Sequence, residues 1–136
     1  MSLIEHLEWC YATKVYREEK VSEEKIKKVL EALRLTVFSR GLQSYRVLVI
    51  SDENIKKRLG EGSFNAQIAK CSHLLVFAVF NHLTPDYISE YIGMTERERD
   101  FPEGALDKFK NALLEAHEGV SKEENSQWSD KQAYIH

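Results

Sequence analysis

Two short apolar runs limit most strongly what this chain can fold into. Tyr45–Ile50 and Leu74–Phe80 are rich in β-branched and aromatic residues, and Val47–Ile50 is apolar without a break. Such a run predicts a strand that is covered on both faces. Helical patterns fill the segment between the two runs, so the strands need not form a hairpin, and a parallel arrangement is open. A sheet of two strands is marginal and leaves both edges open.

Helical patterns occupy most of the remaining chain. The clearest begins at Ser22, a favourable N-cap, with two glutamates in the first turn, where the helix dipole favours acidic side chains. The expected helices cover residues 3–11 and 22–37, a segment capped by Ser51 or Asp52 and ending at Leu59, residues 63–70, a segment beginning at Thr84-Pro85, residues 106–116, and a last helix capped by Ser121 or Ser126. The order predicts an α/β (α+β) fold, a single domain over residues 1–136 with helices around a small sheet.

Composition and charge exclude several classes of protein. Of the 136 residues, 43% are hydrophobic, and the net charge is −3 with basic and acidic residues interleaved, which argues against a nucleic-acid-binding protein. The N-terminus does not resemble a signal peptide, and no apolar run is long enough to cross a membrane. Two cysteines are not a disulfide framework. We therefore expect a cytoplasmic protein with free thiols.

His6 and Cys10 lie four residues apart, but two ligands do not make a metal site, so no metal is expected.

Four stretches of the chain, in order, resemble the nitroreductase family of FMN-dependent NAD(P)H oxidoreductases. Tyr11-Ala12-Thr13-Lys14 is similar to the family's R-[HYF]-[SA]-x-[KR] signature. Ser39–Tyr45 is similar to its A-P-S-S-x-x-x-Q-P-W segment. Ser72–Phe77 resembles A-S-H-x-x-V-F, and Trp128–Ile135 resembles W-x-x-K-Q-x-Y-[IL]. The resemblance implies a nitroreductase-like fold. Because the apolar pattern of the last helix is still running at Ile135, we expect a truncated chain without the family's C-terminal strands.

The resemblance also implies a function. Family members bind FMN at a dimer interface and pass electrons from NAD(P)H to a nitroaromatic, quinone or similar small acceptor. The flavin carries the chemistry, so no catalytic acid or base is expected among the side chains. We expect a homodimer or domain-swapped oligomer, because a partner would cover side chains that the missing strands leave exposed. These are Val47, Val49, Leu75 and Phe77.

The resemblance carries nine residues over as cofactor-binding candidates. Lys14 matches the basic position that contacts the FMN phosphate, and Ala12 matches a small residue beside the flavin. Cys10 stands where the family usually has arginine, and cysteine cannot replace that permanent cation. The remaining candidates are the loop residues Ser39, Arg40, Gly41 and Leu42, expected against the flavin ring, and the amides Asn65 and Gln67, expected at the ring edge or ribityl chain.

Two interpretations of the chain stay open. The first is a nitroreductase-like flavoprotein, impaired or not by truncation. The second is a non-catalytic remnant that keeps the scaffold, dimerises and binds no flavin. Cys10 and the missing strands favour the second interpretation. So does the loop after the second helix, where Val37 and Phe38 replace the family's usual proline and serine and Ser44 replaces a proline. The four stretches in family order favour the first.

Overall fold

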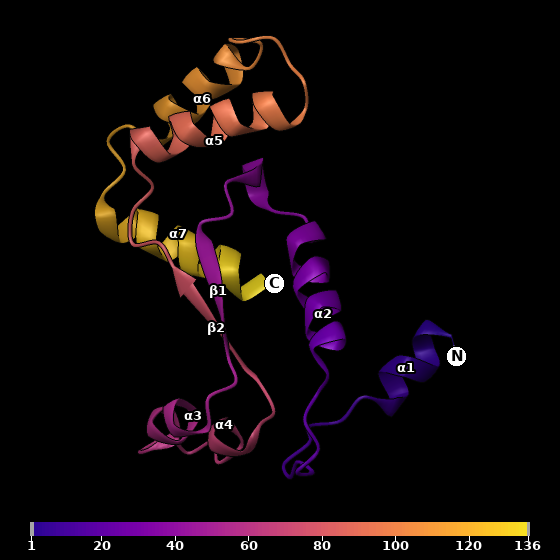
Figure 1. Cartoon of the computed structure of the whole chain (residues 1–136). Helices are drawn as coiled ribbons and strands as arrows, with labels where there is room; N and C mark the ends of the chain where they lie inside the picture. Colours follow the sequence, from indigo (N-terminus) through magenta and orange to yellow (C-terminus); the bar gives the residue numbers. More distant parts are fainter. Residues whose placement is uncertain (1, 136) are drawn as a thin grey trace. The chain divides into compact units, whose positions relative to one another are not determined.

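The computed structural model describes residues 2–135 as a helix-rich chain with one small sheet (Figure 1). This confirms the predicted mixed fold of helices around two strands. The elements are α1 (Leu3–Trp9), α2 (Glu23–Leu35), the 3₁₀ turn η1 (Ser39–Gly41), β1 (Tyr45–Ile50), α3 (Glu53–Gly60), α4 (Gln67–Lys70), β2 (Leu74–Val79), α5 (Pro85–Glu98), α6 (Asp107–His117) and α7 (Lys122–Ile135). None of the described helices is long and apolar enough to cross a membrane.

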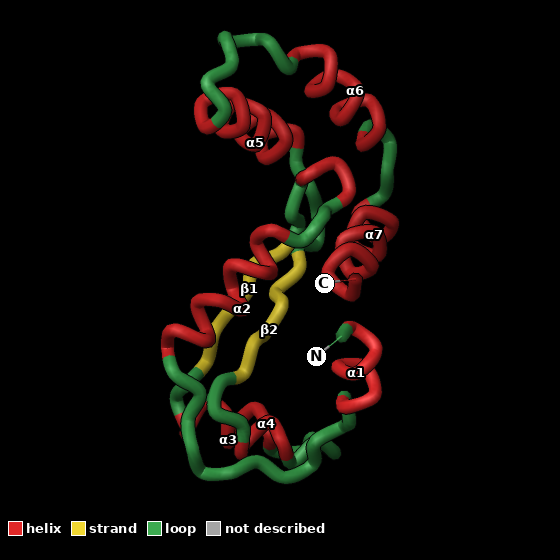
Figure 2. Tube along the Cα trace, turned by 90° about the vertical axis from the view of Figure 1, so that its right-hand side faces the viewer, coloured by secondary structure: helices red, strands yellow, loops and turns green. Residues whose placement is uncertain are grey.

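The strands β1 and β2 pair directly with each other, and they lie side by side in both views of the chain (Figures 1 and 2). The backbone N–H of Phe80, just after β2, donates to the carbonyl of Ser44, just before β1, at 2.9 Å. Since the start of one strand meets the end of the other, the pair is antiparallel. The sequence left a parallel pair of strands open, and the structure does not adopt it.

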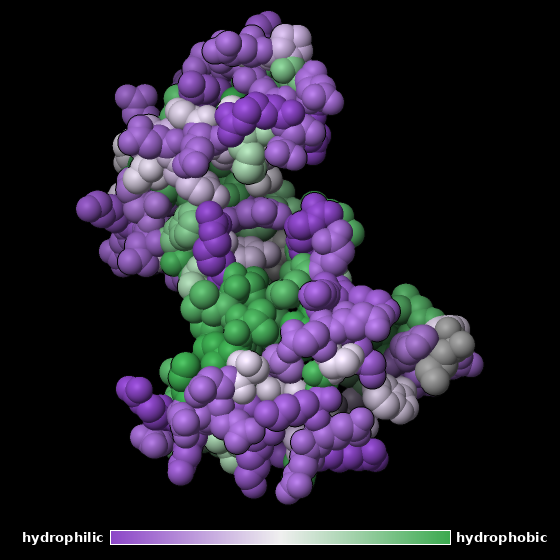
Figure 3. All heavy atoms as spheres, in the orientation of Figure 1, coloured by the Kyte–Doolittle hydropathy of each residue, from purple (hydrophilic) through white to green (hydrophobic). Residues whose placement is uncertain are grey.

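The expectation that both faces of the strands are covered is wrong for the described chain. Leu48 is 51% exposed and Val49 is 38% exposed, and no residue of β2 is fully buried. Apolar surface is visible around the strands in the space-filling view (Figure 3). The apolar runs do form strands. A sheet of only two strands, however, is too small for the surrounding elements to bury both of its faces. The partial exposure expected for Val47, Val49, Leu75 and Phe77 is confirmed.

The chain divides into two compact units. Unit 1 comprises Met1–Ile26 and Val49–Val76, and unit 2 comprises Lys27–Leu48 and Phe77–His136. In unit 1, α3 packs against α4. Lys56 of α3 is only 3% exposed, and its ammonium donates to the carbonyls of Cys71 and Ser72. Two backbone acceptors thus balance the burial of this charge.

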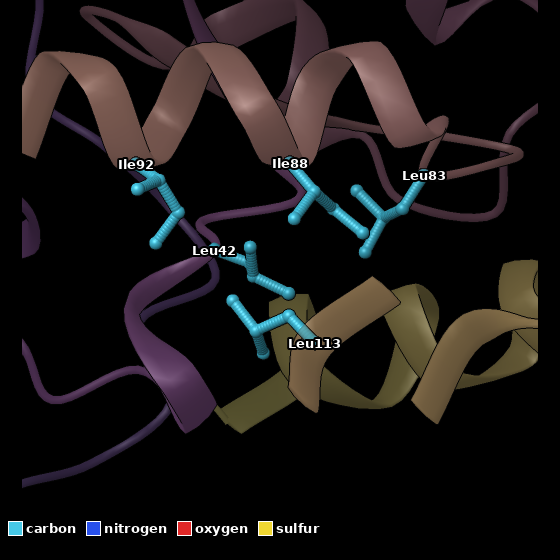
Figure 4. Packing of buried hydrophobic residues seen from close by; sticks show 5 residues of the cluster. All are labelled: Leu42, Leu83, Ile88, Ile92 and Leu113. Carbon is cyan, nitrogen blue, oxygen red and sulfur yellow. The ribbon is translucent and has the colours of Figure 1, made fainter. Parts of the chain in front are cut away.

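Unit 2 holds the main hydrophobic core. Leu42, Leu83, Ile88, Ile92 and Leu113 form a buried cluster (Figure 4), with α5 packed against α6. The predicted start of α5 is confirmed, since Thr84 caps the helix through the N–H of Tyr87 and Pro85 opens it. Ile88 and Ile92 of α5 are two of the five buried residues.

Helix α4 is shorter than predicted because side chains compete for backbone hydrogen bonds before it. Residues 63–66 do not join α4. Instead, the N–H of Asn65 donates to the hydroxyl of Ser63, and the N–H of Gln67 donates to the Asn65 side chain. Such local bonds offer the backbone an alternative to a helix. Two other helices also end earlier than predicted: α2 ends at Leu35 rather than at Val37, which is 88% exposed, and α1 ends at Trp9 rather than at Tyr11.

The cap of α7 makes the stability of the helix depend on pH. Ser121 is the residue that caps it, since its hydroxyl accepts the N–H of Glu124 while its hydroxyl and N–H both donate to the Glu124 carboxylate. These two donors hold the pKa of Glu124 below its ordinary value. A carboxyl whose pKa is lowered on folding stabilises the fold above its unfolded pKa, and this contribution is lost as pH falls through the folded pKa.

Replacing Ser121 with alanine should therefore lower the melting temperature by a few degrees at pH 7 and by less at pH 3. Thermal denaturation followed by circular dichroism at the two pH values measures both shifts. Ser126→Ala is the matched control, because Ser126 was the alternative cap and should show neither effect. An equal loss for both variants would mean that Ser121 does not cap the helix.

Candidate functional site

Unit 1 brings together two of the stretches expected to bind a cofactor. Cys10, Ala12 and Lys14 lie in an extended, exposed segment that follows α1. The side-chain amide of Gln67, at the start of α4, donates to the backbone carbonyl of Thr13. This bond ties the α1 segment to α4 across more than fifty residues of sequence. Lys14 and Gln67 therefore lie in one neighbourhood, as a shared binding role requires.

The two amide residues are already partly engaged within unit 1. The Asn65 side-chain oxygen accepts the N–H of Gln67 at 3.0 Å and fixes the first turn of α4. One N–H of the Gln67 amide donates to Thr13, which leaves its second N–H and its amide oxygen for a ligand contact. Asn65 itself is exposed, whereas Gln67 is half-buried.

Unit 2 contains the turn formed by Ser39, Arg40, Gly41 and Leu42. Arg40 and Gly41 both have left-handed backbones, with φ of 59° and 72°, so the side chains of Ser39 and Arg40 are presented to solvent. Leu42 is completely buried in the core, and its carbonyl accepts the Tyr87 hydroxyl at 2.7 Å. Packing thus anchors the turn at Leu42, and Ser39 and Arg40 carry its accessible polar groups.

Each unit offers its own polar groups. In unit 1, the ammonium of Lys14 can neutralise a phosphate and the amide of Asn65 can bond carbonyl and hydroxyl groups. In unit 2, the hydroxyl of Ser39 can donate or accept a hydrogen bond. Cys10 is an exposed free thiol and supplies no permanent charge. Within residues 2–135, no group of three or more His, Cys, Asp or Glu side chains is arranged to hold a metal.

Sequence reasoning missed a group of buried polar side chains in unit 2. Asn125 and Ser129 of α7 are 2% and 0% exposed, and Ser44 beside β1 is fully buried. Their types predict a solvent-facing surface, and α7 has no continuous apolar stripe that would mark its inner face. Within the described chain, Ser44 Oγ, Ser129 Oγ, His82 Nδ1 and Asn125 Nδ2 are buried without a hydrogen-bond partner.

Comparison with known proteins places most of the chain in one group. Residues 8–127 match the model of the Nitroreductase family. A protein of Staphylococcus haemolyticus assigned as an NAD(P)H nitroreductase is 30% identical over 98% of this chain and 64% of its own length. The major NAD(P)H-flavin oxidoreductase of Aliivibrio fischeri is also 30% identical, over 98% of this chain and 65% of its own. The chain thus spans slightly under two thirds of these relatives.

A solved structure supports the fold. A protein of Exiguobacterium sibiricum, assigned as a nitroreductase and crystallised in complex with FMN, superposes on this chain with a TM-score of 0.74 at 22% identity. The superposition covers 99% of this chain and 67% of that one. This confirms the predicted nitroreductase-like fold.

Proposed function

Because the chain belongs to the nitroreductase family, we propose that it serves electron transfer from NAD(P)H through FMN to a nitroaromatic or quinone-type acceptor. The bond between Gln67 and the carbonyl of Thr13 carries the proposal, because it joins the basic signature ending at Lys14 to Gln67 on α4 and to Asn65, which bonds to Gln67 just before the helix. The two relatives with 30% identity are named for NAD(P)H-dependent reduction, one of them for a flavin, which supports the same assignment.

The polar groups of the chain fit FMN in chemical type. FMN, when bound, accepts a hydride from the nicotinamide and passes electrons to the acceptor. Lys14 would bind the phosphate of FMN, because its ammonium is exposed and lies in an extended segment that is itself exposed to solvent. Asn65 and the side-chain amide of Gln67, in the same unit, would orient the polar parts of the cofactor. Ala12 adds little bulk beside them.

A specific observation favours a second function. Cys10 is exposed and stands where the family has arginine, so the phosphate loses a bidentate cationic donor. The engagement of the Gln67 amide nitrogen removes one further donor. The alternative proposal is therefore a non-catalytic, dimerising form of the scaffold that binds no flavin.

Flavin titration of the purified chain distinguishes the two functions. If FMN binds through Lys14, the protein should turn yellow with excess FMN, and Lys14→Gln should weaken FMN binding about tenfold, the loss of roughly 1.4 kcal/mol. Riboflavin lacks the phosphate, so its affinity should be the same for both proteins. Quenching of flavin fluorescence measures all four affinities.

Two further variants sharpen this titration. Lys25→Gln removes another exposed lysine of unit 1 and should leave FMN affinity unchanged. Cys10→Arg should raise FMN affinity and leave riboflavin affinity unchanged. A chain that stays colourless and shows no change in melting temperature with excess FMN would favour the alternative, and equal effects of Lys14→Gln on FMN and riboflavin would remove Lys14 from the phosphate site.

We also propose that two copies of the chain associate. No residue of α1 is buried, and Leu3, Ile4 and Leu7 on this helix are each at least 61% exposed. Burying such side chains is worth roughly 1.5–3 kcal/mol each, so a second copy covering them would be stabilised. Light scattering coupled to size-exclusion chromatography should give twice the chain mass, and Leu7→Lys should shift the mass toward the monomer. A stable monomer for the unaltered chain would contradict this.

A further inference from the structure

One buried charge of unit 1 lies outside the residues proposed to bind FMN. Lys56 of α3 is 3% exposed, although lysine is almost never fully buried unless it is paired. Its ammonium donates to the carbonyl of Cys71 and, at 3.1 Å, to the carbonyl of Ser72. Both acceptors belong to the backbone, so this charge fixes the path of the chain rather than the orientation of another side chain.

The two carbonyls directly follow α4, a helix of only four residues. A helix this short has too few internal hydrogen bonds to be stable without contacts to other elements. Helices α3 and α4 lie side by side in both views of the chain (Figures 1 and 2). They approach closely at the end of α3, where a Cβ on Gly60 would lie 3.3 Å from the Cβ of Ala69. Lys56 and this close packing together hold α4 against α3.

The position of α4 determines where the segment with Lys14 begins. Gln67 is the first residue of α4, and its side-chain amide donates to the carbonyl of Thr13. Lys14 follows Thr13 directly, in a stretch without helix or strand. The bond to Thr13 can form only while α4 stays in place, so it anchors one end of this stretch to α4.

A second bond anchors the other end of the same stretch. The hydroxyl of Ser72 accepts the backbone N–H of Val21 at 2.7 Å. The carbonyl of this same serine is one of the two that Lys56 holds. Residues 14–20, called here the strap, therefore run between two anchors, and Lys56 binds the backbone between the two anchoring side chains.

An ammonium is well suited to this place. Hydrogen bonds from a charged donor are roughly twice as strong as neutral ones, and one ammonium can serve both carbonyls at once. None of the four residues of α4 is itself buried. Loss of the two bonds should therefore open α4 and the strap locally and leave the rest of the fold intact.

We propose that Lys56 is a positioning residue for the FMN phosphate site. Through α4 and the strap, it holds Lys14 in the place where the phosphate would bind. Lys56 contacts no ligand and takes part in no chemical step. The role of Lys14 rests on the proposed function, whereas the link between Lys56 and the strap is independent of any flavin.

Alkylation of Cys71 measures whether Lys56 holds α4. The thiol is half-buried and donates to the carbonyl of Ile68 at 3.1 Å, so iodoacetamide should reach it only when α4 opens. Without flavin, Lys56→Met should speed the alkylation about tenfold, and Lys56→Arg, which keeps a cation and its donors, should restore most of the protection. Lys57→Met is the matched control, because Lys57 is exposed on the same helix, and it should react like the unaltered chain. Mass spectrometry distinguishes Cys71 from Cys10.

Limited digestion with trypsin follows the strap itself. Arg17 lies in the middle of the strap and is exposed. Because a protease needs a locally open chain, cleavage after Arg17 should also be about tenfold faster in Lys56→Met. It should be unchanged in Lys57→Met. If Lys56→Met leaves either the alkylation rate or the cleavage rate unchanged, the proposal is overturned, whether or not the chain binds FMN.

Titration with FMN connects the strap to the cofactor. Lys56→Met should weaken FMN binding about tenfold. The loss should be clearly smaller in the Lys14→Gln background, because the ammonium that Lys56 positions is then already absent. A loss by the same factor in both backgrounds would show a merely structural role and overturn the proposal. If the unaltered chain binds no FMN, the proposed function fails, and the alkylation and cleavage rates still decide whether Lys56 holds the strap.

Discussion

Leu113→Ala is expected to lower the free energy of unfolding by about 2–5 kcal/mol. Leu113 is 1% exposed and points from α6 toward Leu42, while Leu83 and Ile88 close the cluster from the side of α5 (Figure 4). Truncation removes transfer free energy and leaves a cavity that rigid neighbours fill only in part. Because domains are stable by only about 5–15 kcal/mol, this change takes a large share of the total.

Urea denaturation followed by circular dichroism measures the effect of Leu113→Ala. Leu35→Ala provides the control, because the same atoms are removed from a side chain of α2 that is 65% exposed. That variant should change stability by no more than about 0.5 kcal/mol. Equal losses for the two variants would mean that the cluster around Leu113 is not the stabilising core of unit 2.

The elements that sequence predicted correctly are those whose signals are local. The bounds of β1 follow from the β-branched run Tyr45–Ile50, and the start of α5 follows from the cap and proline at Thr84-Pro85. The direction of β2 relative to β1 has no such local signal. It depends on how the helices between the strands turn the chain, and the structure shows an antiparallel pair where sequence left a parallel one open.

Buried polar residues were beyond sequence reasoning for a different reason. Lys56 and Asn125 have side chains that are usually exposed, and each is buried here with a hydrogen-bond partner distant in sequence. Lys56 donates to two carbonyls more than ten residues away, and Asn125 accepts from Leu83 across 42 residues. Only the fold creates these pairs, so no spacing within one helix could predict them.

The candidate cofactor residues also divide into features that sequence identifies and features that only the fold creates. Resemblance identified the segments around Lys14 and Asn65, but the bond from Gln67 to Thr13 that joins them is a tertiary contact. Leu42 was expected against a flavin ring, but its side chain is completely buried in the hydrophobic core of unit 2. A motif thus places a residue in a segment, and packing decides which of its atoms remain accessible.

Gly41→Ala is expected to cost about 2–4 kcal/mol of stability for two separable reasons. The backbone of Gly41 has φ of 72°, which costs a residue with a Cβ about 1–2 kcal/mol. In addition, the new Cβ would overlap the hydroxyl of Tyr91, which has to move. Gly119→Ala isolates the first cost, because Gly119 has φ of 74° and its Cβ would meet no atom within 4 Å.

The Tyr91→Phe background isolates the second cost. Without the hydroxyl, Gly41→Ala should be destabilising by about as much as Gly119→Ala, which is a coupling of about 1–2 kcal/mol in the double-mutant cycle. Urea denaturation of the four proteins of the cycle and of Gly119→Ala measures both the backbone cost and the coupling with the Tyr91 hydroxyl. If Gly41→Ala costs the same in both backgrounds, Tyr91 does not press on the turn, and its shape is set by backbone conformation alone. A coupling near the expected value would instead mean that the Ser39–Leu42 turn is held against α5 by packing, which is how a loop between a helix and a strand acquires the rigidity that a binding surface needs.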